Sequence, residues 1–171
     1  MNENINVGNY NSEAYKYLLL ARNAYQQFLL KKQRLSIIDN QIAMAQNMYP
    51  NNTPQYYENR LQLQNSRFQE EMQMRQAIET IASNASIATV YALLALQISI
   101  ASKDQISAIL HDNVLTTICA FIELTGLQGD IHNAYKRYCV IGGVPMKTAE
   151  IISNNLSFSF PGISKLQTIL V

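Results

Sequence analysis

The chain has 171 residues, a length that fits one domain with a sizeable buried core. Apolar residues make up 48% of it, an ordinary share for a globular protein, which argues against wholesale disorder. The formal net charge is +1 and the longest basic run is Lys31-Lys32, so composition argues against a nucleic-acid-binding protein, which needs clustered Lys and Arg to contact phosphates.

Charged side chains are scarce. They make up 15% of the residues, against roughly 25% in typical soluble domains, and the 17 Asn and 15 Gln together outnumber them. Two explanations stay open. A surface of uncharged polar side chains loses its water easily and suits permanent contact with other proteins. Alternatively, an AT-rich genome raises the share of Asn, Ile and Tyr.

The N-terminus and the two cysteines bear on whether the chain carries a signal peptide and whether it forms disulfides. The segment 1–15 contains neither a positive nor an apolar stretch, so no classical signal peptide is predicted. Cys119 and Cys139 are too few for a disulfide framework and lack the CxxC spacing of many metal and redox sites. We expect two reduced, partly buried thiols.

A long helical hairpin is predicted over residues 12–101. Between Gly8 and Gly126 there is no glycine, and the only prolines are Pro50 and Pro54. This spacing predicts one helix over 12–48, a short turn, and a second, antiparallel helix that begins near Pro54 and runs to residue 101. Apolar residues follow helical spacing in both: Leu18, Ala21, Tyr25, Phe28, Leu35, Ile38, Ile42 and Ala45 in the first, and Tyr57, Leu61, Phe68, Met72, Ile78, Ala82 and Ala85 in the second.

Charges test the register of this hairpin. A short turn places each residue of the first helix opposite one residue of the second, and opposite charges meet at the expected positions. The predicted pairs are Lys31 and Lys32 with Glu70 and Glu71, Arg22 with Glu79, and Asp39 with Arg67. Because an exposed pair contributes under about 1 kcal/mol, the pattern supports register more than stability.

A third helix is predicted over residues 103–124. Ser102 and Gln105 have the spacing of a capping box, in which each side chain satisfies a backbone donor near the other. Gly126 is placed to end the helix in a left-handed conformation. The apolar stripe consists of Ile106, Leu110, Val114, Ile118 and Phe121.

The C-terminal part of the chain changes in character. A short helix is predicted over 130–140, ended by Gly142-Gly143, and a brief helical segment over Pro145–Ser153. Leu156–Phe160 alternates apolar and polar residues with period two, and Pro161-Gly162 has the composition of a turn. We therefore expect a short β-hairpin or an extended arm at the end.

The predicted fold is all-α: a long antiparallel helical hairpin, shorter C-terminal helices and an extended or β-hairpin tail. The predicted organisation is an N-terminal arm (1–11), the hairpin (12–101), a helical region packed on it (102–141) and a C-terminal arm (142–171).

The most apolar stretch is Ala85–Ala101, which contains a single Gln and no charged residue. A transmembrane helix needs about 20 predominantly apolar residues, so this segment is at the lower limit of length. Three interpretations are open: a helix buried on all sides, a membrane-inserting segment, and an oligomer interface. The small residues at 82, 85, 88, 92 and 95 allow another helix to approach closely in each case.

Residues capable of catalysis or metal binding are few. His111 and His132 are the only histidines, and neither stands in an HxxxH or HExxH pattern. Cys119 lies among apolar helix neighbours, which raises the pKa of a thiol and makes it inert. No P-loop, nucleophile elbow or GxGxxG pattern occurs. The sequence predicts no enzyme, no cofactor and no metal site; an enzyme would require His111, Cys119 and Glu123 to converge in a cleft.

Tyrosines and the apolar ends are the candidate interface residues. Tyrosine provides large contact area at low entropic cost. The predicted contact residues are Tyr49, Tyr56, Tyr57, Tyr91, Leu94, Phe158 and Phe160.

These patterns favour a non-enzymatic structural subunit that packs with copies of itself or with other structural chains. A virion component, of the phage internal or connector type, is the expected setting, and a secretion-apparatus filament is the next. The alternative is a membrane-active or pore-forming helical protein that inserts residues 85–101.

Overall fold

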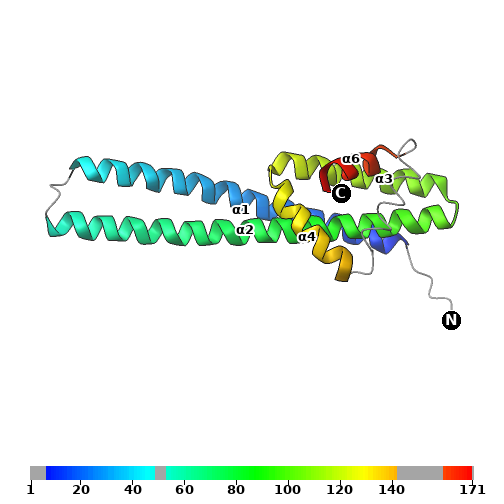
Figure 1. Cartoon of the computed structure of the whole chain (residues 1–171), viewed down its shortest axis with the longest axis horizontal. Helices are drawn as coiled ribbons and strands as arrows, with labels where there is room; N and C mark the ends of the chain where they lie inside the picture. Colours follow the sequence, from blue (N-terminus) through cyan, green and yellow to red (C-terminus); the bar gives the residue numbers. More distant parts are fainter. Residues whose placement is uncertain (1–6, 49–52, 142–159, 171) are drawn as a thin grey trace. The chain divides into compact units, whose positions relative to one another are not determined.

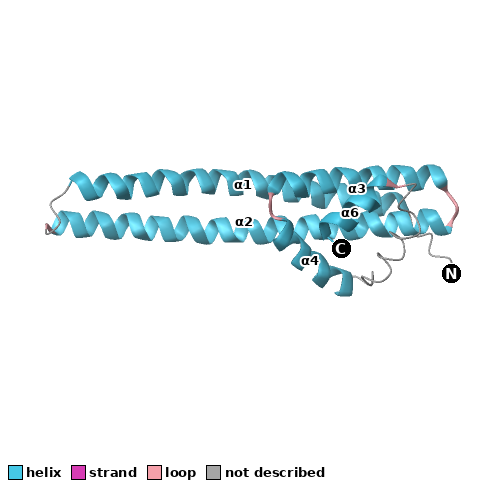
Figure 2. Cartoon of the chain, turned by 45° about the horizontal axis from the view of Figure 1, so that its top comes forward, coloured by secondary structure: helices cyan, strands magenta, loops and turns pink. Residues whose placement is uncertain are grey.

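The structure is a computed structural model that describes residues 7–48, 53–141 and 160–170. These ranges contain helices and no strand (Figure 1; Figure 2). The helices are α1 (Val7–Met48), α2 (Pro54–Ala101), α3 (Gln105–Thr125), α4 (Gln128–Ile141) and α6 (Pro161–Leu170). The predicted all-α class and the long helical hairpin are confirmed.

The chain divides into two compact units. The hairpin unit consists of residues 24–79, and the cluster unit consists of residues 1–23 and 80–171. Helices α1 and α2 each contribute to both. The predicted domain limits after residues 11, 101 and 141 stay predictions.

In the hairpin unit, α1 and α2 lie side by side and antiparallel (Figure 1). The α1 residues that face α2 are buried or half-buried and follow one another in alternating steps of four and three. This spacing is the repeat of a coiled-coil seam, which keeps one narrow face of a helix against its partner. The seam residues of α1 are Ala24, Phe28, Lys31, Leu35, Ile38, Ile42 and Ala45, and those of α2 include Tyr56, Leu63, Glu70, Met74 and Ala77.

The start of α2 follows helix-capping rules. Pro54 occupies the first position, where its missing N–H costs nothing. The hydroxyl of Thr53 accepts a hydrogen bond from the backbone N–H of Tyr56 at 3.4 Å. The predicted boundary is therefore confirmed, with its cap one residue upstream.

Two of the predicted cross-helix charge pairs are present in the hairpin unit. Lys31 Nζ lies 3.1 Å from Glu70 Oε2, and Arg67 Nε lies 2.8 Å from Asp39 Oδ1. Glu71, predicted to face Lys32, instead pairs with Arg67 one turn away on its own helix at 2.6 Å. The register inferred from charge is correct, and the Arg22–Glu79 pair stays a prediction.

The cluster unit has a conventional apolar core. Its largest fully buried side chains come from α1, α2, α3, α4 and α6: Leu18, Ile81, Leu93, Leu96, Leu115, Ile118, Ile122, Ile131, Tyr135, Ile163, Leu166 and Leu170. Helices α3, α4 and α6 pack against one another. The buried Ser86 of α2 donates its hydroxyl to the carbonyl oxygen of Ile131 in α4 at 3.1 Å, and so connects α2 to this group.

The start of α3 differs from the predicted capping box. The N-cap is Asp104, whose carboxylate accepts from the backbone N–H of Ser107 at 3.1 Å and from its hydroxyl at 2.7 Å. Ser102 instead donates its hydroxyl to the Ile98 carbonyl in the last turn of α2. A carboxylate accepts more strongly than a hydroxyl, so Asp104 takes the cap. The predicted stop is confirmed, because Gly126 has a left-handed φ of 67°.

The predicted β-hairpin or extended tail is wrong for residues 161–170, which form α6. Ile163, Leu166 and Leu170 recur in steps of three and four and are fully buried, so they specify a helical face. Pro161 opens the helix at the position that tolerates proline. The alternating residues 156–159 and the predicted helical segment Pro145–Ser153 lie outside the described residues.

Helix α6 is fixed to α3 by a buried carboxylate. Asp112 of α3 accepts from the backbone N–H of Gly162 at 2.9 Å and of Ile163 at 3.0 Å. Burial raises the pKa of this carboxyl, and the two N–H groups act in the opposite direction. Asp112 therefore caps a helix that comes from a distant part of the chain.

Gly162 is required for this approach. A Cβ built there would meet the backbone oxygen of Asp112, with Thr116 Oγ1 at 2.9 Å. Since a backbone atom cannot move aside as a flexible side chain does, only glycine fits between α6 and α3.

We predict that Gly162→Ala lowers the free energy of unfolding by about 1–3 kcal/mol, the usual range for overpacking a tight site. It should also speed modification of Cys119, whose Sγ lies 3.9 Å from the Gly162 oxygen under α6. Gly129→Ala is the matched control, because apart from its chain neighbours and the nearby backbone of its own helix, no described atom lies within 4 Å of the added Cβ. Urea denaturation and thiol labelling measure both effects; equal stabilities of the two variants would contradict this account.

Candidate interaction surfaces

Of the two ion pairs described above that join α1 and α2, Lys31–Glu70 is the more buried one. The side chains are 16% and 18% exposed, so both charges are mostly withdrawn from water. Arg34 Nη1 lies 3.7 Å from Glu70 Oε1 and makes a second, weaker ion pair with the same carboxylate. A shifted pairing of the helices would bury each charge against an apolar residue. Such a polar layer specifies register at some cost in stability.

Helix α1 carries a second apolar stripe on the face turned away from the seam. Its members are separated by steps of seven and four, so they line one side of the helix. The α1 outer stripe consists of Leu30, Ile37, Met44 and Met48, which are 47%, 50%, 56% and 72% exposed. Gln33 and Gln41 interrupt it.

Helix α2 carries a comparable stripe. It lies on the outer side of the helix, away from the α2 seam residues Tyr56, Leu63, Glu70 and Met74. The α2 outer stripe consists of Tyr57, Leu61, Phe68 and Met72, which are 58%, 60%, 63% and 44% exposed. Large apolar side chains that gather on one exposed face mark a site of contact with another molecule.

The sequence predicted the α2 outer stripe as one helical face but did not distinguish it from the seam. Both faces of α2 follow helical steps, of four and seven residues on the outer face and of three, four and seven in the seam, and the outer face contains two aromatic residues against one in the seam. The seam is recognised only by the charges, because Glu70 must face Lys31 and Arg67 must face Asp39.

At the tip of the hairpin, the predicted interface tyrosines have different environments. Tyr49 lies outside the described residues. Tyr56 is 8% exposed, whereas its neighbour Tyr57 is 58% exposed. Their rings meet edge to face at 5.5 Å between centroids. Of these two described tyrosines, Tyr56 is thus a packing residue of this hairpin, and Tyr57 presents its ring to solvent.

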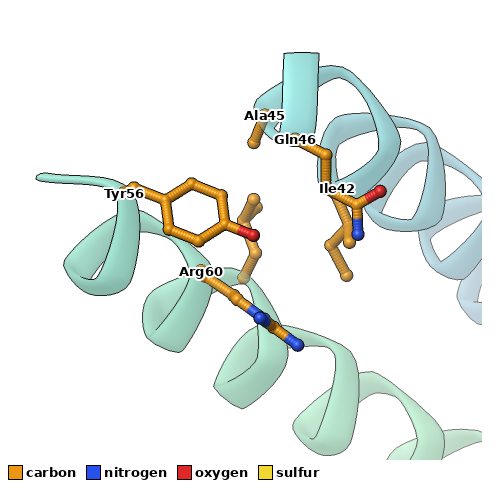
Figure 3. A pocket seen from close by; sticks show the side chains of 6 residues that line it. Ile42, Ala45, Gln46, Tyr56 and Arg60 are labelled. Atoms are coloured by element: carbon orange, nitrogen blue, oxygen red, sulfur yellow. The ribbon is translucent and has the colours of Figure 1, made fainter. Parts of the chain in front are cut away.

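A small cavity beside Tyr56 is no ligand site. The Tyr56 ring extends from α2 toward Ala45 and Gln46 of α1, with Arg60 beneath it (Figure 3). The enclosed volume is about 10 Å³, and one water molecule needs about 10–15 Å³ on that measure. The space left by these side chains is at most that of a single water.

The remaining predicted contact residues lie in the cluster unit. Tyr91 of α2 is half-buried, and its ring packs on Tyr17 and Tyr10 of α1 with centroids 5.7 Å and 5.9 Å away. Leu94 is also half-buried, and Phe160 is 7% exposed. Phe158 lies outside the described residues.

His111 and Cys119 do not form a catalytic pair. They lie eight residues apart on α3, which separates them by about 12 Å along the helix. His111 is 6% exposed, and its two ring nitrogens are buried and make no hydrogen bond to the described residues. Burial lowers the pKa of this imidazole. Burial raises the pKa of Cys119 to about 12, so the thiol stays protonated at neutral pH.

The other titratable residues that the sequence analysis named are Glu123, Cys139 and His132. Glu123 is exposed and pairs with Lys165 of α6 at 3.0 Å. Cys139 is buried, which raises the pKa of its thiol, and His132 is half-buried. Across the part of the chain that the structure describes, no three His, Cys, Asp or Glu side chains gather as a metal site would require.

Among the helices that the structure describes, two are long and apolar enough to cross a membrane. They are α2, through its apolar second half, and α3. Within the structure, 61% and 50% of their most apolar windows are buried. Length and composition alone do not distinguish such helices from the core helices of a soluble protein.

Comparisons with known proteins give no relative: no protein-family model, no curated protein and no solved structure matches the chain.

We predict that Glu70→Leu lowers the free energy of unfolding by on the order of 1–3 kcal/mol, because it leaves the Lys31 charge in the seam without its partner. The double variant Lys31→Leu/Glu70→Leu should recover that loss, since an apolar pair needs no compensation. Glu58→Leu, on an exposed position of the same helix, is the control and should stay within about 0.5 kcal/mol of the parent chain. Urea denaturation measures all three. A double variant as unstable as the single one would show that the ion pair does not act as a unit.

Proposed function

We propose that this chain is a non-enzymatic structural subunit that assembles by packing its helices against other protein chains. The observation that carries the proposal is the pair of outer stripes on the hairpin unit. Among the described residues of that unit, nine large apolar side chains are more than a third exposed, and all but Leu29 belong to one of the two stripes: Leu30, Ile37, Met44, Met48, Tyr57, Leu61, Phe68 and Met72.

The spacing of these side chains supports packing against helices. Isolated exposed leucines are ordinary on protein surfaces, but steps of four and seven align side chains along one helical face. A two-helix hairpin covers one face of each helix and leaves the others to solvent. In this chain those faces remain apolar, which a free monomer avoids.

The surface polar residues support a permanent contact. Gln and Asn interrupt the stripes more often than charged residues do, for example Gln33 and Gln41 on α1 and Gln64 and Asn65 on α2. Uncharged amides lose water at lower cost than charges and can hydrogen-bond across an interface. A multi-chain complex such as a virion, with this chain as an internal or connector-type component, is the setting we propose.

The proposal predicts self-association or association with a partner of defined stoichiometry. Light scattering after gel filtration should give a mass above the 19.3 kDa of one chain, rising with concentration. The mass should persist at high salt, because apolar contacts are not screened. A monodisperse 19.3 kDa species at high concentration, with no co-purifying chain, would contradict the proposal.

A membrane-active protein is the second candidate. It is favoured by the two consecutive helices α2 and α3, which both reach membrane-spanning length and apolarity, and by the exposed Ile106, Ile109 and Leu110 of α3. In this candidate the helices would leave the core of the cluster unit and insert residues 85–101 into lipid.

Liposome flotation separates the two candidates. A structural subunit should remain in the dense fractions with vesicles of neutral or anionic lipid, since its apolar helices stay in their own core. A membrane-active chain should float with the vesicles and release a trapped dye. Flotation with dye release would replace the assembly proposal with the second candidate.

A further inference from the structure

We infer that the α2 outer stripe is a homotypic interface at which the α2 helices of two copies pack antiparallel about a two-fold axis between Gln64 and Asn65. This inference rests on the proposed function and names the partner, a second copy of this chain, and the surface. It is carried by the spacing, the chemistry and the charge of the stripe.

The spacing of the stripe is symmetric about its centre. Tyr57 and Met72 lie equally far from the midpoint between Gln64 and Asn65, and so do Leu61 and Phe68. An antiparallel second copy centred there places Phe68 on Leu61 and Tyr57 on Met72, each contact occurring twice. A two-fold interface requires this self-complementarity: if residue i contacts j, then j contacts i.

The residues brought together are chemically matched. A ring packed on a leucine buries apolar surface on both sides, and a methionine sulfur beside a tyrosine ring is a favourable contact. With 58% and 63% of Tyr57 and Phe68 exposed, each ring leaves on the order of 100 Å² to cover. Four rings, two leucines and two methionines bring the interface toward the roughly 1,000 Å² of a specific contact.

The polar centre of the stripe fixes its alignment. Gln64 and Asn65 are exposed, and the two-fold axis places Gln64 of one copy beside Asn65 of the other. Amide groups both donate and accept, so two copies can satisfy each other there. A single polar layer inside an apolar helix interface selects orientation and register, as Lys31–Glu70 does within the hairpin.

Charge permits two copies to approach. Residues 24–79 carry six basic and five acidic side chains, so two hairpin units do not repel each other strongly. Glu71, at the edge of the stripe, is already paired with Arg67 at 2.6 Å. Arg75, which continues the stripe, falls within about one helical turn of the second copy's Glu58.

Cysteine crosslinking tests the antiparallel register directly. Chains with Leu61→Cys and chains with Phe68→Cys should form a disulfide-linked dimer when mixed and oxidised. Neither should crosslink alone, because seven residues separate equivalent positions by about 10 Å along the axis, beyond disulfide reach. Gln64→Cys should crosslink by itself. The natural Cys119 and Cys139 are buried, so the parent chain sets a low background.

Charge insertion tests whether the stripe holds the copies together. Phe68→Glu should reduce the native mass measured by light scattering at least twofold. Ile106→Glu is the matched control: Ile106 is 76% exposed but lies in the cluster unit, so its replacement should leave the mass unchanged. Circular dichroism confirms that each variant keeps its helices.

The outcomes separate the inference from the proposed function. Crosslinks in the predicted pattern, with loss of mass in Phe68→Glu alone, support the inference. A parent chain that associates but is unaffected by Phe68→Glu, or that crosslinks through Leu61→Cys alone, overturns the antiparallel interface and leaves assembly standing. A parent chain that is monomeric at every concentration and without a partner overturns both.

Discussion

Two helices packed against each other cover only one narrow face of each, and this limit governs the hairpin unit. A seam with steps of three and four residues buries about one side chain in every turn of α1, from Ala24 to Ala45. The remaining surface of both helices faces solvent. Apolar residues placed there, such as Ile37 and Phe68, are not covered by the two helices of the hairpin and stay exposed.

The cluster unit shows what the same chain does when further helices are present. There α3, α4 and α6 pack together, and the α2 alanines at 82, 85, 88, 92 and 95 are buried. Small residues let helices approach closely, and Ser86 meets the α4 backbone at 3.1 Å. The contrast between the two units is therefore one of helix number: α2 is covered where neighbouring helices exist and exposed where only α1 accompanies it.

The long helices were predictable because helix breakers are confined to a few positions. The prolines at 50 and 54 and the glycine at 126 mark the end of α1, the start of α2 and the end of α3 within a few residues, and the charges of Lys31 and Glu70 set the hairpin register. Helix-breaking residues act on their immediate neighbours, and the register depends only on opposite charges facing each other. Both can therefore be read from the sequence.

Other features depend on contacts distant in sequence. Helix α6 is stabilised by Asp112, far upstream in the chain, and its short apolar pattern cannot by itself be told from an extended arm. Which of the two apolar faces of α2 packs against α1 can be decided only from the three-dimensional structure, because both faces have helical spacing. Of the four residues of the α2 outer stripe, the sequence predicted only Tyr57 as a contact residue, and it placed all four on one helical face without separating that face from the seam.

The account depends most on α1 and α2 folding back on each other with the Lys31–Glu70 register. Pulsed electron paramagnetic resonance between spin labels on exposed glutamines measures this directly, with one pair at Gln33 and Gln69 and another at Gln41 and Gln62. The account predicts short and nearly equal distances for both pairs, consistent with helix axes about 10 Å apart. Two clearly unequal distances, about 54 Å for the first pair and about 32 Å for the second, as one continuous helix would give, would contradict it.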